Sequence, residues 1–199
     1  MKGIVFYEDY IKAALEGKKT RHRILMDKQP EYIGNGCYEW VMKDNQPVVF
    51  KKYPMKGHLE QAVKKPCSAG EYLFIKERWA ETEDGIIYKA ENPDLTNEKA
   101  KEISVDGKGW RTPVHMTKKK SRIQIYVDSI GVDRLLNITE NEAAKEGVQP
   151  ESIEIPGVGV RPSYKQGFLK RWKDVYGDKG GENPFIWVIE LRVVKTENE

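Results

Sequence analysis

The stretch NPFIWVIELRVV, residues 183–194, decides the fold of this chain. Its first half is apolar at every position, so an extended backbone would present apolar side chains on both of its faces. A strand that is apolar on both faces is typical of a central position in a sheet or barrel, where neighbours cover it from two sides. The segment therefore predicts a β-rich domain built around residues 183–194.

A second strand is predicted at SRIQIYVDSIGVDRL, residues 121–135. Ile123, Ile125 and Val127 alternate with polar or amphipathic side chains, which is the period of a strand with one buried face. GEYLFIKERW, residues 70–79, alternates in the same way and carries the carboxylate of Glu77 on its apolar face. Further strands are expected near the start of the chain and at residues 37–53, where two strands flank a turn at DNQP.

Three short helices are predicted from their start and stop signals. Residues 139–146 have Thr139 as N-cap and Glu142 as its capping-box partner, and Gly147 ends the helix. The other two helices cover residues 7–15 and 163–176, and each is followed by a glycine. Their predicted apolar faces consist of Tyr7, Ile11, Ala14 and Leu15 in the first, and of Phe168, Leu169, Trp172 and Val175 in the second.

These elements predict an α+β, mostly β architecture, and closure of the strands into a small barrel is plausible. The 199 residues fit one domain, residues 1–199, with insertions around 83–120 and 148–162. Residues 83–120 are turn-rich and charged and are interpreted as a long decorated loop. Residues 148–162 are interpreted as a loop or hairpin.

The composition gives little information about partners, because 34 Lys and Arg face 31 Asp and Glu for a formal charge of +3. Any affinity for nucleic acid must come from local clustering of charge. No apolar run reaches the length of a membrane span and the start of the chain lacks a signal-peptide core, so a cytoplasmic protein without membrane contact is expected. Cys37 and Cys67 lack the spacing of a metal site, so we expect buried thiols, no metal and no cofactor.

The most concentrated charge lies in EGKKTRHRIL, residues 16–25, directly after a glycine that ends a helix. In an extended segment Lys19, Arg21 and Arg23 point to one side, while Lys18, Thr20 and His22 point to the other. A lysine in such cationic company can have a lowered pKa and act in catalysis. The alternative is a solvated strand edge whose charge prevents aggregation, and the segment alone leaves both open.

Other candidate residues are isolated in the sequence, and each has a structural alternative. A carboxylate at a helix end is usually exposed, and one on an apolar strand face must pair with a cation or reach solvent. Tryptophans can stack a base or anchor a loop, and a loop histidine can be a ligand, an acid-base group or neither. These candidates are Glu146, Glu77, Trp79, Trp110 and His115.

Four separated segments resemble the ASCH-domain family, in its large branch encoded in bacteriophages and prophages. They are ALEGKKTRHR, GEYLFIKERWAE, the segment from WRTPVHM through SRI to NITENEAAKEGV, and NPFIWVIEL. The resemblance covers nearly the whole chain. It implies a PUA-like fold, a small β-barrel with short helices over its openings, and a cleft between GKKT, KERW and AAKEG. It also implies a protein of a bacterial host cell, encoded by a phage or prophage.

In a smaller branch of that family, members are amidohydrolases that remove an acetyl group from acetylated cytidine, and ribonuclease activity is reported for others. Carried over by position, the catalytic lysine is Lys19 and the glutamate is Glu146. The threonine of that branch falls on His22 here, which excludes an acyl-enzyme at this position and leaves His22 as a general base for water.

Two main functional hypotheses follow. In the first, the cleft binds RNA or a nucleotide, with Lys19, Arg21 and Arg23 near phosphate and Trp79 or Trp110 stacking a base. Thr20 is a further candidate for binding. In the second, the protein is a hydrolase of a modified nucleoside or of RNA, with Lys19, His22 and Glu146 as the catalytic set. A third possibility is a phage accessory or structural protein, and binding is favoured slightly over catalysis.

Overall fold

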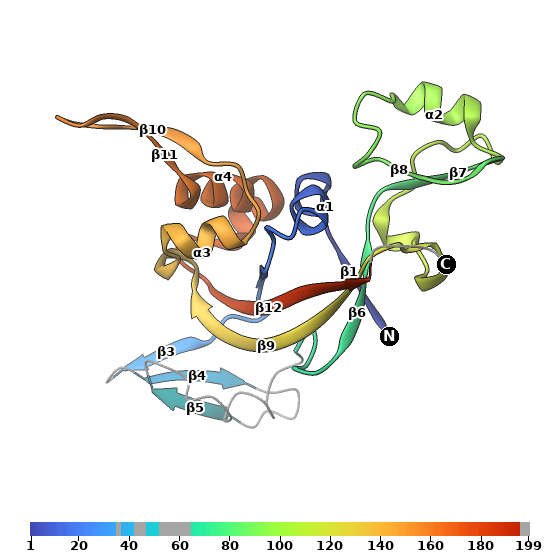
Figure 1. Ribbon diagram of the computed structural model, residues 1–199. Helices are drawn as coiled ribbons and strands as arrows, with labels where there is room; N and C mark the ends of the chain where they lie inside the picture. Colours follow the sequence, from blue (N-terminus) through green and yellow to red (C-terminus); the bar gives the residue numbers. More distant parts are fainter. Residues whose placement is uncertain (35–36, 42–46, 52–64, 196–199) are drawn as a thin grey trace.

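The computed structural model describes residues 1–34, 37–41, 47–51 and 65–195, with the backbone alone described at 32–34, 37–41, 47–51, 179–180 and 195. The chain forms a central sheet, three helices on one face of it, and three smaller β units (Figure 1). This confirms the predicted α+β, mostly β class, and the described residues contain four short α-helices, one more than predicted. The predicted turn at DNQP and the side chain of Cys37 lie outside the described residues.

The central sheet has five strands in the order β1-β6-β9-β12-β2. Only β1 and β6 are parallel, and the other neighbours are antiparallel. The strands are β1 (Lys2–Val5), β6 (Tyr72–Lys76), β9 (Gln124–Arg134), β12 (Phe185–Lys195) and β2 (Arg21–Leu25). The apolar strand β12 lies between β9 and β2, which confirms its predicted central place.

The sheet curves strongly, and its two edge strands approach each other. Ile4 of β1 and Ile24 of β2 line the same cavity of about 220 Å³. Within the described residues no strand joins β1 to β2, so the sheet stays open there and a closed barrel is not observed.

Helices α1 (Glu8–Leu15), α3 (Glu140–Lys145) and α4 (Tyr164–Tyr176) all cover the same concave face of this sheet (Figure 1). The core between them and the sheet is apolar and includes Ile11, Ile125, Phe168 and Ile189. Burial of such side chains contributes roughly 1.5–3 kcal/mol each.

The capping predictions for α3 and α4 are confirmed. Thr139 and Glu142 form the capping box, and the Ser163 hydroxyl accepts from the backbone of Gln166. The predicted face of α1 is partly wrong, since Tyr7 and Leu15 are exposed. Tyr7 is the N-cap in an extended conformation, so the buried positions of the short helix are Tyr10, Ile11, Ala13 and Ala14 instead.

Residues 83–120 are not a loop but most of an ordered unit, which we call the α2 lobe (residues 79–120). It contains β7 (Trp79–Thr82), β8 (Gly85–Tyr88), α2 (Asn97–Ile103) and the short 3-10 turns Pro113–His115 and Lys118–Lys120. Trp79, Tyr88 and Met116 form its small core. The prediction failed because three apolar residues spread over a charged segment give no periodic signal.

The remaining units project from the central sheet. Residues 148–162 form most of a hairpin of β10 (Glu151–Ile155) and β11 (Gly159–Ser163), so the hairpin alternative is confirmed. The hairpin extends away from the rest of the molecule (Figure 1). Strands β3 (Glu31–Gly34), β4 (Cys37–Val41) and β5 (Pro47–Lys51) form a sheet on the other side, as the sequence indicated for 37–53. The 3-10 turns Leu135–Asn137 and Gly177–Gly180 follow β9 and α4. None of the described helices is both long and apolar enough to cross a bilayer.

Candidate functional site

Lys19 is turned into the protein by the way in which α1 ends. Gly17 takes a positive φ of 70°, and the backbone amides of Lys18 and Lys19 both donate to the carbonyl of Ala13, at 2.8 and 3.0 Å. Glycine adopts this left-handed conformation without a steric penalty, so the chain can reverse tightly under the helix. The side chain of Lys19 consequently has an exposed fraction of 0%.

The ammonium group of Lys19 is fully engaged. It donates to the carbonyl of Arg21 at 2.7 Å, to the carbonyl of Glu146 at 2.8 Å and to Oε2 of Glu146 at 3.2 Å. The rings of Tyr10 and Phe6 lie with their centres 3.9 and 5.2 Å from Nζ. Three donors meet three acceptors, so the surroundings suit the charged form.

Burial lowers the pKa of Lys19 from its usual value, while the carboxylate of Glu146 opposes that shift. A neutral amine would have two N–H donors for the same three acceptors, leaving one acceptor unpaired in the interior. Lys19 therefore serves here as a hydrogen-bonding cation, although its pKa is lowered.

Glu146 is buried, which corrects the expectation of an exposed helix end. Its Oε1 accepts from Nη1 of Arg23 at 2.7 Å, and its side chain has an exposed fraction of 1%. Two cations compensate for its place at the negative end of α3. The backbone amide of Thr20 donates to the carbonyl of Lys145 at 2.9 Å and holds the helix end against the GKKT segment.

The contacts extend outward from this pair. Arg21 bonds Glu142, and also Glu190 at 2.8 Å, while Ser129 donates to Glu190 at 2.9 Å. The alternation predicted for Lys19, Arg21 and Arg23 is thus confirmed, because they meet acids of α3 and β12. We call these six residues the charge network: Lys19, Arg21, Arg23, Glu142, Glu146 and Glu190.

Three positive side chains meet three negative ones in the charge network, so it is neutral as a whole. Each cation is committed to at least one carboxylate, and Arg23 and Lys19 are buried. Arg21 and Arg23, which the sequence placed near a phosphate, are therefore not presented to a ligand in this arrangement. The network joins α3 to β2 and β12.

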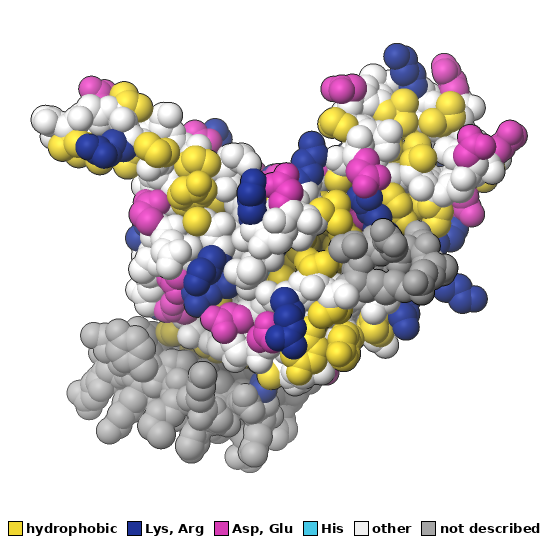
Figure 2. All heavy atoms as spheres, viewed as in Figure 1, with side chains coloured by type: hydrophobic (Ala, Val, Ile, Leu, Met, Phe, Trp, Pro, Cys, Tyr) yellow, Lys and Arg dark blue, Asp and Glu magenta, His cyan; other side chains and the backbone are white. Residues whose placement is uncertain are grey.

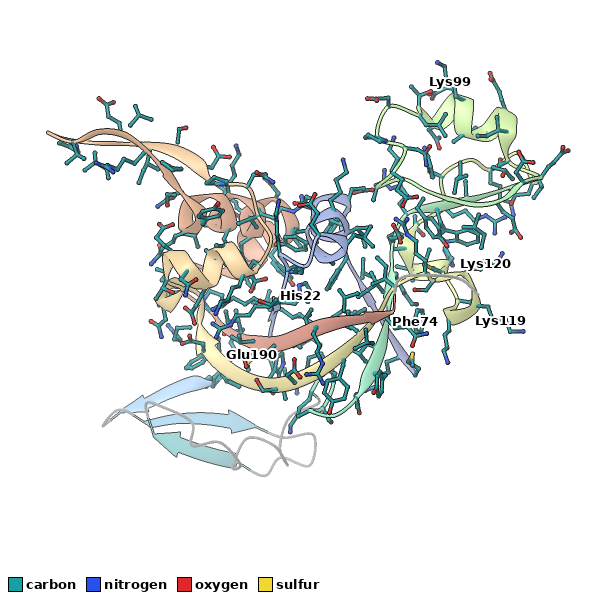
Figure 3. All side chains as sticks on the ribbon, viewed as in Figure 1. His22, Phe74, Lys99, Lys119, Lys120 and Glu190 are labelled. Carbon is teal, nitrogen blue, oxygen red and sulfur yellow. The ribbon has the colours of Figure 1, made fainter. Side chains whose placement is uncertain are left out.

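His22 faces the other way and packs in the core beneath α1 (Figure 3). Its ring lies 4.8 Å from that of Phe6 and 5.9 Å from that of Tyr10, and its Nδ1 is buried without a hydrogen bond. Burial, and then the charge of Lys19, hold the pKa of His22 well below 6.5. His22 makes no hydrogen bond to Lys19 or Glu146 in the described structure, so the three predicted catalytic residues are neighbours but not a relay.

Glu77 belongs to a different part of the molecule. Arg122 binds it with two hydrogen bonds, of 2.9 and 3.0 Å, and also bonds Glu91. Burial raises the pKa of Glu77, and Arg122 opposes the shift. The expectation that this carboxylate must pair with a cation or reach solvent is confirmed by an arginine 45 residues away in sequence.

The three other candidate residues, Trp79, Trp110 and His115, all lie in the α2 lobe. Trp79 is buried with an exposed fraction of 1%, and Arg111 and Lys120 lie over its ring at 4.5 Å each. Trp110 is partly buried and donates from its indole to the carbonyl of Leu95 at 3.0 Å. His115 is exposed. Trp79 is thus an anchor of the lobe, and a base cannot stack on it without displacing its cations.

A pocket of about 680 Å³ lies between α1, the end of α3 and the base of the β10–β11 hairpin. Figure 2 shows charged side chains of both signs in the saddle above α1. The pocket is lined by Glu8, Asp9, Lys12, Ala13, Glu16, Lys18, Ala144, Lys145, Gly147, Val148, Gln149 and Tyr164. Sequence reasoning missed Lys12, Lys145, Gln149 and Tyr164, which share no motif.

The floor of this pocket separates it from Lys19. A Cβ atom on Gly147 would lie 2.4 Å from Cβ of Ala13 and 3.1 Å from Cβ of Lys19, and Gly147 has a φ of 78°. Only glycine fits this contact. Ala13 and Gly147 therefore lie between the pocket and the buried Lys19–Glu146 pair, as a layer one residue thick.

No group of His, Cys, Asp and Glu suited to a metal ion occurs among the described residues. No family model, curated protein or solved structure matches the chain.

Proposed function

We propose that this chain binds a nucleotide, free or within single-stranded RNA, in the pocket between α1, α3 and the hairpin. The observation that carries the proposal is a pair of lysines, Lys12 and Lys145, on a pocket with an apolar floor and an aromatic wall. Within the described residues neither lysine makes a hydrogen bond or ion pair, and Lys145 interacts with Glu190 only at longer range. Its volume of about 680 Å³ lies within the usual range of small-molecule sites.

The charges of the lining favour an anion. Its three carboxylates are already engaged: Glu8 with Arg78 at 3.4 Å, Asp9 with Arg171 at 3.1 Å, and Glu16 with Lys18 at 2.6 Å. In contrast, Lys12 and Lys145 make no hydrogen bond or ion pair within the described parts of the chain. Two ammonium groups from different helices remain for a phosphate.

The other lining residues suit the base and sugar. Ala13, Gly147 and Val148 supply apolar surface, the Tyr164 ring is partly exposed, and Gln149 offers an amide donor and acceptor. Base-to-aromatic stacking and hydrogen bonds to base edges are the usual means of recognising an unpaired nucleotide.

We also propose that the central sheet is an opened form of the PUA-like barrel that the ASCH resemblance implies. Two facts support this proposal: the edges β1 and β2 share a cavity, and the GKKT and AAKEG segments touch through Lys19 and Glu146. The KERW segment places its Glu77 with Arg122 instead.

Hydrolysis of an acylated nucleoside is the second candidate, because a buried lysine-glutamate pair lies one residue below the pocket. The pair has no access to a ligand in this structure, and all three donors of Lys19 are used. Binding therefore ranks above catalysis.

The test measures binding of nucleoside 5′-monophosphates and of a short single-stranded RNA to the wild type and to Lys12→Ala/Lys145→Ala, over a series of salt concentrations. We expect the double variant to lose most of its affinity. The slope of log affinity against log salt for RNA should become shallower by about 1.4, since each phosphate contact contributes about 0.7.

The matched control is Lys99→Ala/Lys119→Ala, which removes two exposed lysines that lie away from α1 (Figure 3). Equal losses of affinity in the two double variants would indicate nonspecific electrostatic attraction and would refute the proposal. Chromatography of the incubated acylated cytidines and RNA tests the second candidate, since product formation would establish hydrolysis.

A further inference from the structure

The face of the central sheet that points away from the helices carries one row of stacked side chains. Tyr72 of β6 pairs in register with Tyr126 of β9, and Tyr126 pairs with Arg192 of β12. The two tyrosine ring centres are 5.1 Å apart, and the guanidinium of Arg192 lies 4.5 Å from the Tyr126 ring centre. Three neighbouring strands thus place two aromatic rings and a cation side by side.

This row is accessible. Tyr72 has an exposed fraction of 51%, the Arg192 side chain one of 60%, and Tyr126 is partly exposed. Figure 2 shows hydrophobic side chains gathered at the lower right of the view, over the part of the sheet where β6 lies, with charged side chains beside them. The alternate residues Leu73, Ile125 and Leu191 point into the core, so the exposed row is not needed to fill it.

We propose that Tyr72, Tyr126 and Arg192 form a stacking platform for the bases of a single-stranded nucleic acid. An aromatic ring and an arginine plane both accept a base by stacking, and the exposed outer face of the curved sheet leaves room for successive nucleotides. An ion pair with Asp128, at 2.9 Å, holds the guanidinium of Arg192 in place, so Arg192 contributes a stacking plane and not a free positive charge.

The neighbours of the row suit nucleic acid better than a protein partner. Gln124 lies two residues before Tyr126 on β9, on the same face, and supplies an amide donor and acceptor for a base edge. Asp128, two residues after Tyr126, pairs with Arg192 at 2.9 Å and fixes its position. A stable protein interface needs a fully buried apolar centre within about 800 Å² per partner. Two tyrosines flanked by polar and charged residues do not provide that centre.

The platform goes beyond the proposed pocket and does not depend on it. The pocket opens among helices α1 and α3 on the concave side, whereas the platform lies on the opposite face of the sheet. A mononucleotide fits the pocket, while the platform requires several linked nucleotides because its stacking surfaces are spread over three strands.

The experiment compares binding of short single-stranded oligoadenylate and oligouridylate, by fluorescence anisotropy, to the wild type, Tyr72→Ala/Tyr126→Ala and Tyr72→Phe/Tyr126→Phe. Melting temperatures verify that each variant is folded. We expect a loss of about tenfold or more for the alanine variant, since base stacking is worth that much per ring. The phenylalanine variant keeps both rings and should stay within about twofold of the wild type.

Three outcomes would overturn the platform: no oligonucleotide binding by the wild type, unchanged binding by the alanine variant, or equal losses in the alanine and phenylalanine variants. Lys12→Ala/Lys145→Ala, measured in parallel, separates the two proposals. If it loses mononucleotide binding, and the oligonucleotide binding that remains falls further when Tyr72→Ala/Tyr126→Ala is added to it, both sites stand. If the wild type binds oligonucleotides through the tyrosines and binds no mononucleotide, only the platform stands.

Discussion

Replacing Glu146 with alanine should destabilise the protein strongly, because this carboxylate neutralises two buried cations. Its Oε1 accepts from Arg23 at 2.7 Å and its Oε2 from Lys19 at 3.2 Å. After the substitution Lys19 keeps only two backbone carbonyls, and the nearest acid to Arg23 is Glu142, with 3.6 Å between nitrogen and oxygen. Both charges would remain in the interior without a full partner.

The size of this effect follows from burial. Removing one partner of a buried ion pair costs about 3–5 kcal/mol, against a median of about 0–1 kcal/mol for exposed pairs. In a domain of this length about 1 kcal/mol lowers the melting temperature by about 2–4 °C, so a fall of roughly 6–20 °C is expected. Glu146→Gln keeps the shape but removes the charge, and it should show a large part of the same fall.

Thermal unfolding followed by circular dichroism measures the effect, with Glu190→Ala as control. Glu190 belongs to the same charge network, but its side chain is 45% exposed, so its loss should lower the melting temperature by no more than about 4 °C. If Glu146→Ala melted within about 2 °C of the wild type, the network would not be the structural connection between α3 and β2 that its geometry indicates.

Three further predictions concern buried residues. Burial, and then the charge of Lys19, hold the pKa of His22 well below 6.5. The neutral imidazole therefore contributes fully to the free energy of unfolding above about pH 6.5. This contribution is lost as the pH falls, by up to about 1.4 kcal/mol per pH unit. Urea unfolding at several pH values should show a shallower acid decline for His22→Phe, and parallel curves would refute this. Gly147→Ala should lower the free energy of unfolding by about 2–5 kcal/mol, because of the positive φ and the clash with Ala13. Adding Ala13→Gly should relieve the clash but not the backbone strain. A Gly147→Ala protein as stable as the wild type would contradict this packing. Burial raises the pKa of the Cys67 thiol to about 11. Peptide mapping should therefore find Cys67 unmodified by iodoacetamide near neutral pH until the protein is unfolded. Fast labelling of the native protein would contradict this prediction.

The sequence predicted the elements whose signals are local. The alternation of residues 121–135, the apolar run at 183–194 and the Thr139 capping box each depend on a few neighbouring residues, and the structure contains all three. The barrel prediction went further than local signals allow, because closure depends on how far β1 and β2 approach across the sheet.

The site was harder to predict because its contacts are long-range. Glu146 was expected to be exposed, yet it is buried by Lys19 and Arg23, which lie 127 and 123 residues away in the chain. The pocket lysines, Lys12 and Lys145, come from two helices that meet only through the fold. The family resemblance pointed to the AAKEG segment but not to Lys145 within it, and nothing marked Lys12, so only the three-dimensional arrangement identifies the two lysines.

The basic stretch at residues 18–23 is explained by the acids it meets and not by a ligand. Every cation on its inward side has a glutamate partner, so a ligand carboxylate or phosphate could bind Lys19 only by replacing Glu146. That ligand would also have to displace Gly147, whose contact with Ala13 closes the pocket floor. The two lysines that remain open to a phosphate, Lys12 and Lys145, lie outside the stretch and above this floor. In the proposed function a ligand would therefore occupy the pocket without reaching the buried pair, and catalysis by Lys19 would require movement of the end of α3. Product formation that survives a crosslink fixing α3 to α1 would refute this order of events.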